Sequence, residues 1–235
     1  MAQPLSKVRS LSYSPRVGYS LVAQQYEAWH WFQFWQRNER PIVEQWANSV
    51  YPGLLLDAGS GTGLYRQALE QAGHTVISVD ASPEMLAVQK DRHPTAITIA
   101  ADILELPFPD SCFDYLLCTR VLSHIAKLEP ALSEFARVTK PTAELLLADV
   151  HPNHRYSDMS VPLNGERISI ETYKHPVEEI KSAIRPPLRL LDFHEYRLQD
   201  LTWKPPAKSF ENIYDAPDRP IFYVALLRRQ RGLIG

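Results

Sequence analysis

Short apolar runs alternate with helix-like segments through the middle of this chain, and this alternation restricts the fold more than any other feature. The runs cover residues 53–57, 75–80, 96–100, 113–118 and 144–148. Within each run the apolar residues are nearly continuous and do not alternate with polar ones, a pattern typical of parallel strands covered on both faces. The sequence therefore predicts a doubly wound α/β domain.

Helix signals occupy the connections between these runs. Tyr65, Ala68, Leu69 and Ala72 follow the spacing i, i+3, i+4, i+7 of one helix face. Ser82-Pro83 has the form of an N-cap followed by proline in the first helical position. Another apolar stripe spans residues 131–138. Strand and helix therefore alternate in chain order across residues 51–150.

The two flanks differ from this core. Residues 1–50 carry a cluster of tryptophans and phenylalanines, which predicts an N-terminal helical lid. Residues 151–235 contain a polar segment and two late strands, over 188–198 and 221–228. We expect this part to supply the substrate side of the site and to complete the same domain. The aromatic stripe at residues 29–35 is interpreted mainly as packing.

Composition excludes several classes of protein. Twenty-five Lys+Arg against 27 Asp+Glu give a net charge of −2, without the basic excess typical of nucleic-acid binders. Cys112 and Cys118 are too few for a disulfide framework and lack metal-site spacing. We find no apolar segment of the secretory type near the N-terminus, and no apolar run reaches the ~20 residues of a membrane span. We expect a soluble, cytoplasmic protein without a metal, nucleic-acid or membrane partner, and the sequence leaves its oligomeric state open.

The densest signal is the segment 57–63, Asp-Ala-Gly-Ser-Gly-Thr-Gly, directly after a predicted strand and before a helix. Alternate glycines allow a tight turn and a close approach of the backbone to a ligand, and the next helix offers free N–H groups. Asp80 ends the second strand, where a carboxylate can bind both hydroxyls of a ribose. Asp102 follows the third strand and could accept from an adenine amine. A turn of this kind also fits NAD, which stays an alternative. A nicotinamide site, however, requires neither Asp57 before the turn nor Asp102 after the third strand.

Together these motifs resemble the class I S-adenosylmethionine-dependent methyltransferases, specifically the small-molecule group with a Rossmann-like sheet. The similarity extends in consistent order over roughly residues 50–150. The segments that carry it are Asp57–Gly63, Val79–Met85, Ala101–Ile103, Leu106–Asp110, Phe113–Tyr115, Val121–Ile125 and Leu132–Pro141. The chain departs from the family at Thr142-Ala143, where glycines are usual, so this turn is expected to differ with little effect on cofactor binding.

The resemblance implies a seven-stranded, mostly parallel sheet with one late antiparallel strand, and S-adenosyl-L-methionine as cofactor. It implies that the backbone around Gly59, Gly61 and Gly63 faces the methionine moiety. Asp57 would help to hold the methionine amino group, through its backbone or a water. Asp80 would bind the ribose hydroxyls.

The same resemblance implies the contacts of the adenine. Asp102 and the backbone of Ile103 would bind the base, and Met85 or its neighbour Ala81 would pack against the ring. Thr119, just past the fourth strand, would border the methionine carboxylate.

Residues outside the central strands are candidates for closing the site and for catalysis. Tyr19 and Tyr26 lie in a stretch that resembles the family's tyrosine-containing N-terminal helix and would close over the cofactor. His151, His154 and His175 follow the fifth strand, and one of them is expected to act as a base or to orient the acceptor, because histidine titrates near neutral pH. The opposing interpretation makes them loop and cap residues.

His124 is interpreted as structural.

The function that follows is methyl transfer to a small molecule, with the acceptor atom open between O, N and C. An aromatic, a quinone-like and a carboxylic acceptor all stay open. Two alternatives remain: an NAD-type oxidoreductase, and a protein that keeps the fold and binds the cofactor without catalysis.

Overall fold

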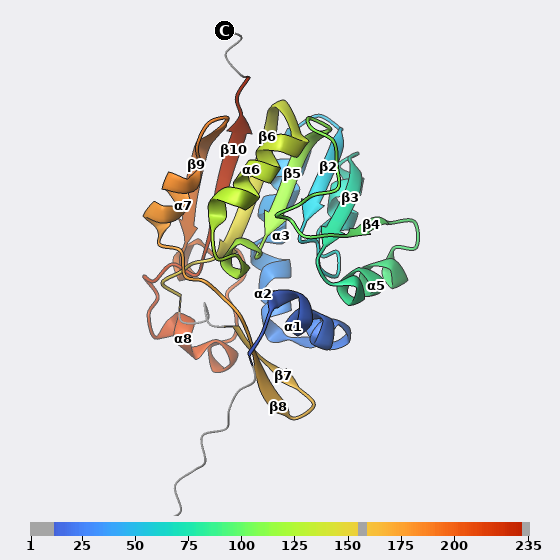
Figure 1. Cartoon of the computed structure of the whole chain (residues 1–235). Helices are drawn as coiled ribbons and strands as arrows, with labels where there is room; N and C mark the ends of the chain where they lie inside the picture. Colours follow the sequence, from blue (N-terminus) through green and yellow to red (C-terminus); the bar gives the residue numbers. More distant parts are fainter. Residues whose placement is uncertain (1–11, 155–158, 232–235) are drawn as a thin grey trace, which may run out of the picture.

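The computed structural model describes residues 12–154 and 159–231, and its centre is a seven-stranded sheet (Figure 1). The strands lie in the order β4, β3, β2, β5, β6, β10, β9. The pairs from β4 to β6 are parallel, whereas β10 is antiparallel to both β6 and β9. Their bounds are β2 Leu54–Ala58, β3 Thr75–Asp80, β4 Ile97–Ala100, β5 Phe113–Thr119, β6 Thr139–Val150, β9 Leu188–Tyr196 and β10 Phe222–Arg229. The predicted mostly parallel sheet with a late antiparallel strand is confirmed.

Both faces of this sheet are buried, which explains the continuous apolar runs. Leu55 and Leu117 pack into one hydrophobic cluster, and their neighbours Leu56 and Leu116 pack into the other. Successive side chains of a strand point to opposite faces, so both must be apolar when both faces are covered. One face is covered by α6 Leu128–Val138 and α7 Val177–Ala183, and the other by α3 Arg40–Ser49, α4 Arg66–Gln71 and α8 Glu211–Tyr214. In Figure 1, α6 lies in front of the sheet and α3 behind it.

The N-terminal aromatic region forms several short helices where the sequence suggested one. It consists of α1 Pro15–Val22, η1 Ala23–Ala28 and α2 His30–Asn38, and α3 follows. Trp29 has extended backbone angles, φ −72° and ψ 139°, which separate η1 from α2. Among the helices of the described ranges, none is long and apolar enough to cross a membrane.

A second, three-stranded sheet lies below the carboxyl ends of the parallel strands in Figure 1, beside α1. The hairpin of β7 Met159–Leu163 and β8 Glu166–Ile170 is joined by the two-residue strand β1 Ser12–Tyr13, which is parallel to β8. The sequence does not predict this sheet, because β1 has only two residues and because β7 and β8 lie in a segment interpreted only as polar. It brings residues 159–172 over the same edge of the main sheet as α1.

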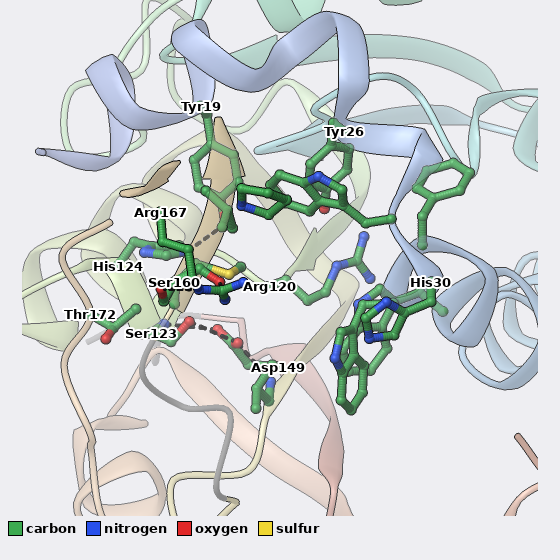
Figure 2. Close-up of a pocket in the computed structure, with 18 residues that line it drawn as sticks. Tyr19, Tyr26, His30, Arg120, Ser123, His124, Asp149, Ser160, Arg167 and Thr172 are labelled. Atoms are coloured by element: carbon green, nitrogen blue, oxygen red, sulfur yellow. Dashed lines mark hydrogen bonds between the residues drawn. The ribbon is translucent and has the colours of Figure 1, made fainter. Parts of the chain in front are cut away.

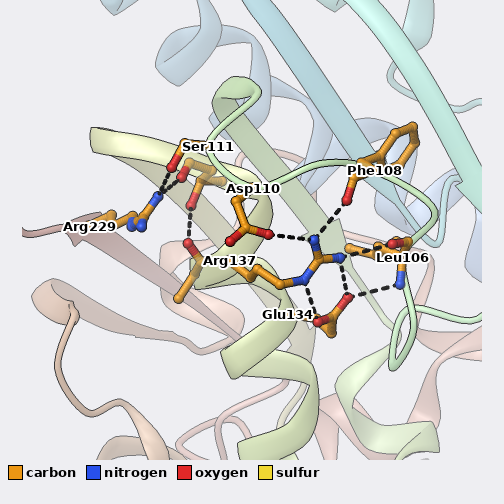
Figure 3. A network of polar contacts seen from close by, with 9 residues as sticks. Leu106, Phe108, Asp110, Ser111, Glu134, Arg137 and Arg229 are labelled. Atoms are coloured by element: carbon orange, nitrogen blue, oxygen red, sulfur yellow. Dashed lines mark hydrogen bonds and ion pairs between the residues drawn. The ribbon is translucent and has the colours of Figure 1, made fainter.

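The segment between β4 and β5 is held by one arginine of α6 (Figure 3). Arg137 donates to the carboxylates of Glu134 and Asp110, and also to the carbonyls of Leu106 and Phe108 at 2.9 and 2.7 Å. A planar guanidinium can bind several oxygens in fixed directions, which an ammonium cannot. This network fixes the chain just before β5, whose carboxyl end carries part of the site described below.

Helix α5, Pro83–Arg92, begins as the sequence predicts. The Ser82 hydroxyl accepts a hydrogen bond from Met85 N at 3.2 Å, and Pro83 occupies the first turn. An N-cap of this type is worth about 1 kcal/mol to the helix. The cap fixes where the chain leaves β3, and with it the position of Asp80.

Candidate functional site

The glycine-rich turn between β2 and α4 has a backbone that requires glycine. Gly59 and Gly61 have φ of +78° and +53°, a region that side chains with a Cβ rarely adopt. The amides of Gly59 and Ser60 donate to Val79 O at 2.7 and 2.9 Å, which ties the turn to β3. A Cβ added to Gly59 would lie 2.1 Å from Val121 Cγ2. The turn is therefore pressed against the segment that follows β5.

Asp80, the last residue of β3, organises this turn from the other side. Its carboxylate accepts hydrogen bonds from Gly61 N at 2.8 Å and from Ser82 N at 2.9 Å. Burial raises its pKa from the usual value, and the two backbone hydrogen bonds oppose that shift. The carboxylate is thus already oriented at the edge of a cavity, where its remaining lone pairs can accept from hydroxyl groups.

Asp57 is a buried acid that lacks hydrogen-bond partners. Its side chain is at the end of β2 and 1% exposed, and neither oxygen has a partner within the described part of the chain. Burial raises its pKa from 3.8 to about 7, Arg66 lowers it and Asp80 adds to the rise. Buried polar atoms are nearly always paired. A nearby ammonium group would restore the ionised form, and the methionine end of S-adenosylmethionine carries one.

A cavity of about 340 Å³ opens at the turn. Ten of the predicted cofactor residues line it, namely Tyr19, Tyr26, Gly59, Gly61, Asp80, Ala81, Met85, Asp102, Ile103 and Thr119. Asp57 and Gly63 do not line this cavity: Asp57 is buried in β2, and Gly63 is the last residue of the glycine-rich segment. The structure thus brings backbone donors, two acids and apolar side chains together, which fits a ligand with amino, ribose and adenine parts. The individual contacts to the cofactor stay predictions.

A second cavity of about 280 Å³ adjoins the first (Figure 2). Aromatic side chains of residues 26–35 line it, among them Trp29, Trp31, Phe32 and Trp35. The hairpin β7–β8 contributes another wall through residues 159–162 and Arg167. The side chains shared by the two cavities are Tyr19, Tyr26, Arg120 and His124. The aromatic stripe therefore does more than pack, since it also encloses a ligand-sized space.

Several polar groups of this second cavity come from the carboxyl ends of β5 and β6, and others, such as Arg167 and Ser160, come from the β7–β8 hairpin. The Arg120 guanidinium pairs with the fully buried Glu39, donates to the Tyr65 hydroxyl at 2.6 Å and lies over the ring of Trp35. Asp149 accepts from the Ser123 amide and hydroxyl at 2.8 and 2.9 Å. Open α/β sheets bind ligands at the carboxyl ends of their strands. The cavity is therefore lined by aromatic rings from the N-terminal helices and by polar groups from the sheet edge and the hairpin.

The sequence pattern does not single out Arg120 or Asp149, and it favours a structural role for His124. All three line the acceptor-sized cavity. Their positions directly after the fourth and fifth predicted strands carry a usable signal, because a doubly wound sheet places such residues at one edge. His124 lies in the short turn η2, Leu122–His124, that follows β5.

The three histidines predicted as catalytic candidates line neither cavity. His151 Nε2 lies 2.9 Å from Glu195 Oε1, and its Nδ1 accepts from Asn153 N. His175 Nδ1 and Nε2 lie 2.8 and 2.7 Å from Glu179 Oε1 and Ile125 O. His154 packs edge-on against Trp31, and burial lowers its pKa from 6.5 to about 4. A catalytic role for these residues stays a prediction, and their surroundings favour the interpretation as cap and loop residues.

Comparison with known proteins agrees with this geometry. Residues 56–147 match the family model of a methyltransferase domain. A demethylmenaquinone methyltransferase of Renibacterium salmoninarum is 36% identical over 117 residues, 49% of this chain and 49% of that protein. A malonyl-[acyl-carrier protein] O-methyltransferase of Serratia marcescens is 28% identical over 159 residues, 61% and 62% of the two chains. The chain thus spans less than two thirds of the length of these curated relatives.

A solved structure extends the similarity to the fold. The S-adenosylmethionine-dependent methyltransferase of Mesorhizobium loti superposes with a TM-score of 0.63 at 18% identity, covering 80% of this chain and 96% of that one. Residues 56–147 thus match a methyltransferase domain, and the chain shares the fold of a solved S-adenosylmethionine-dependent methyltransferase.

Proposed function

We propose that this protein transfers a methyl group from S-adenosyl-L-methionine to a small acceptor bound in the aromatic cavity. The observation that carries the proposal is the pair of adjoining cavities, which share Tyr19, Tyr26, Arg120 and His124. One of them is built around the glycine turn, which resembles the cofactor-binding motif of the class I methyltransferases. Methyl transfer requires alignment of donor and acceptor and exclusion of water, and two adjoining cavities under a common lid meet both needs.

The chain's own residues provide the binding. The backbone of the glycine turn and Asp57 would hold the methionine part, Asp80 the ribose, and Asp102 with Ile103 the adenine. The cofactor's sulfonium supplies an electrophilic methyl group. The polar groups that line the second cavity at the carboxyl ends of β5 and β6, together with Arg167 of β8, would then orient the acceptor.

The aromatic cavity favours a flat, largely apolar acceptor. Aromatic side chains line one side of it, and the Trp29 indole N–H is buried there without a partner among the described residues. A carbonyl or hydroxyl oxygen on the acceptor would satisfy that donor. The relatives act on a quinone in one case and on a carrier-bound malonyl group in the other. Of these two, the quinone-like acceptor suits the cavity better.

Calorimetric titration with S-adenosylhomocysteine, S-adenosylmethionine and NAD tests the cofactor. We expect micromolar binding of both sulfur compounds, no binding of NAD, and weaker binding in Asp80→Ala. Asp91→Ala is the matched control, because Asp91 is an exposed acid on α5. A folded protein that bound neither sulfur compound would refute the proposal, and binding of NAD would support an oxidoreductase.

A methyl-transfer assay tests the acceptor. The enzyme is incubated with S-adenosylmethionine and either 1,4-naphthoquinol or a malonyl thioester, and the methylated products are identified by mass spectrometry. Turnover of the quinol supports the flat acceptor. Turnover of the thioester alone would assign the protein to carboxyl methylation. Binding of cofactor with no turnover of any acceptor in a wider panel would point to a binding protein without catalysis.

A further inference from the structure

We propose that Tyr19 and His124 together accept a proton from the acceptor, so that the substrate is one that must lose a proton on methylation: a phenol, a quinol or an acidic carbon. This inference rests on the proposed function and deepens it. It separates such acceptors from carboxylates, which are nucleophiles in their ordinary ionised form and need no base.

The two side chains form a hydrogen-bonded pair between the cavities. Tyr19 Oη lies 2.8 Å from His124 Nε2 (Figure 2), and both residues line both cavities. The pair joins α1 of the lid to the turn after β5. The donor side and the acceptor side of the proposed reaction thus meet at this contact.

The second nitrogen of the imidazole fixes which partner donates. His124 Nδ1 lies 2.7 Å from the backbone carbonyl oxygen of Glu171. A carbonyl oxygen only accepts, so Nδ1 carries the hydrogen in this contact. In the neutral imidazole Nε2 is then an acceptor, and the Tyr19 hydroxyl donates to it. The pair is therefore oriented to pass a proton from the cavity through Tyr19 to His124.

The surroundings keep this pair in the protonation state that a base requires. Burial lowers the pKa of His124, with the Glu171 carbonyl and Asp149 opposing, so the imidazole is neutral at pH 7. Burial raises the pKa of Tyr19 well above 10, so its hydroxyl keeps its hydrogen. The charged and titratable groups that act on Tyr19 are Tyr26, Arg120, Asp149 and Asp80. Asp149, which faces the same cavity from β6, would stabilise the imidazolium once formed.

The proton balance of the step is simple. The acceptor's O–H or C–H bond breaks and its electron pair stays on the acceptor, which becomes the nucleophile. The proton binds to the Tyr19 oxygen while the Tyr19 hydrogen moves to His124 Nε2. Tyr19 ends neutral and His124 ends as an imidazolium, still bonded to the Glu171 carbonyl. Release of that proton to solvent restores the pair.

The pH dependence of turnover tests the pair. With 1,4-naphthoquinol, kcat of the wild type should rise through the His124 pKa, below 6.5, and then level off. His124→Gln and Tyr19→Phe should lower kcat by about 10²–10⁴-fold, the usual contribution of a positioned base. His124→Gln should also abolish the acid limb. Tyr26→Phe is the matched comparison: Tyr26 packs edge-on against Tyr19 at 5.9 Å, and its removal should leave the acid limb in place whatever its effect on the rate.

Nitrogen-15 NMR of the imidazole tests the pair without turnover. His124 should show the tautomer with hydrogen on Nδ1 and a pKa below 6.5. In Tyr19→Phe the pKa should rise, because the donor to the neutral imidazole is lost. A histidine that is protonated at pH 7, or that carries its hydrogen on Nε2, would overturn the proposal even if the enzyme were active. Thermal unfolding and S-adenosylhomocysteine titration of each variant show that it is folded and binds.

The outcomes separate this inference from the proposed function. A wild type that does not bind S-adenosylhomocysteine refutes the proposed function. A wild type that methylates the quinol while both variants keep its rate and its pH profile refutes the pair alone. Turnover of only the malonyl thioester refutes the substrate class and leaves methyl transfer intact.

Discussion

Replacing Gly59 by alanine tests whether the contact between the glycine turn and Val121 holds the site together. The alanine would occupy a left-handed backbone at φ +78°, at a cost of roughly 1–2 kcal/mol. Its Cβ would lie 2.1 Å from Val121 Cγ2 and 3.3 Å from Val121 Cβ, so rotation of the valine side chain alone does not relieve every contact. Overpacking of this kind typically adds about 1–3 kcal/mol. We therefore expect a loss of about 2–5 kcal/mol in the free energy of unfolding.

Gly165→Ala is the matched control in urea-unfolding measurements. Gly165 has a similar φ, +85°, but a Cβ there meets no atom within 4 Å. It should cost only the backbone part, so the difference between the two variants measures the contact with Val121. In a Val121→Ala background, Gly59→Ala should lower the free energy of unfolding by about 1–3 kcal/mol less than it does in the wild type. Equal losses at Gly59 and Gly165, or no coupling to Val121, would refute the reasoning.

Three further predictions concern buried charges and the arginine network. Asp57→Asn should flatten the pH dependence of the free energy of unfolding. Burial raises the pKa of Asp57 to about 7, so in the wild type its contribution to stability is complete below pH 4 and is lost as the pH rises to 7, on the order of 4 kcal/mol. Parallel pH profiles of the two proteins in urea unfolding would contradict this. Glu39→Gln leaves the Arg120 guanidinium without its buried partner and should cost about 3–5 kcal/mol, seen as a fall in the melting temperature; an unchanged melting temperature would show that the pair is not stabilising. Arg137→Lys keeps the charge but loses the planar guanidinium that binds four groups. We expect the free energy of unfolding in urea to fall by about 1.5–3 kcal/mol. A loss no greater than that of the exposed Arg228→Lys would contradict the role of the network.

The strands of the main sheet could be predicted because their chemistry is local. Runs such as 113–118 are apolar on both faces, and Ser82-Pro83 marks a helix start whatever surrounds it. The glycine turn could be predicted for the same reason, since its backbone is set by the residues of the turn. The element most clearly missed, the β1–β8–β7 sheet, depends on a two-residue strand pairing with residues more than 150 positions later in the chain.

The catalytic side of the site could not be predicted from local pattern. The pattern favours His151, His154 and His175 because they are histidines after the fifth strand, but they line neither cavity, and His151 and His175 contact Glu195 of β9 and Glu179 of α7. His124 matters because a tyrosine 105 positions earlier reaches its ring. Such a contact follows from how the lid packs on the sheet edge, and no spacing in the sequence expresses it.

The lid's contacts have a consequence for how the protein is made. Residues 12–38 emerge from the ribosome before any strand of the main sheet, yet their partners are far ahead of them: Tyr19 bonds to His124, and Gln25 bonds to the carbonyl of Pro162, 137 positions later. These residues must wait until more than half of the chain has been synthesised, at about 5–20 residues per second. This N-terminal segment is thus synthesised before β2 to β6, yet Tyr19 can be fixed in place only after β5 and Gln25 only after β6.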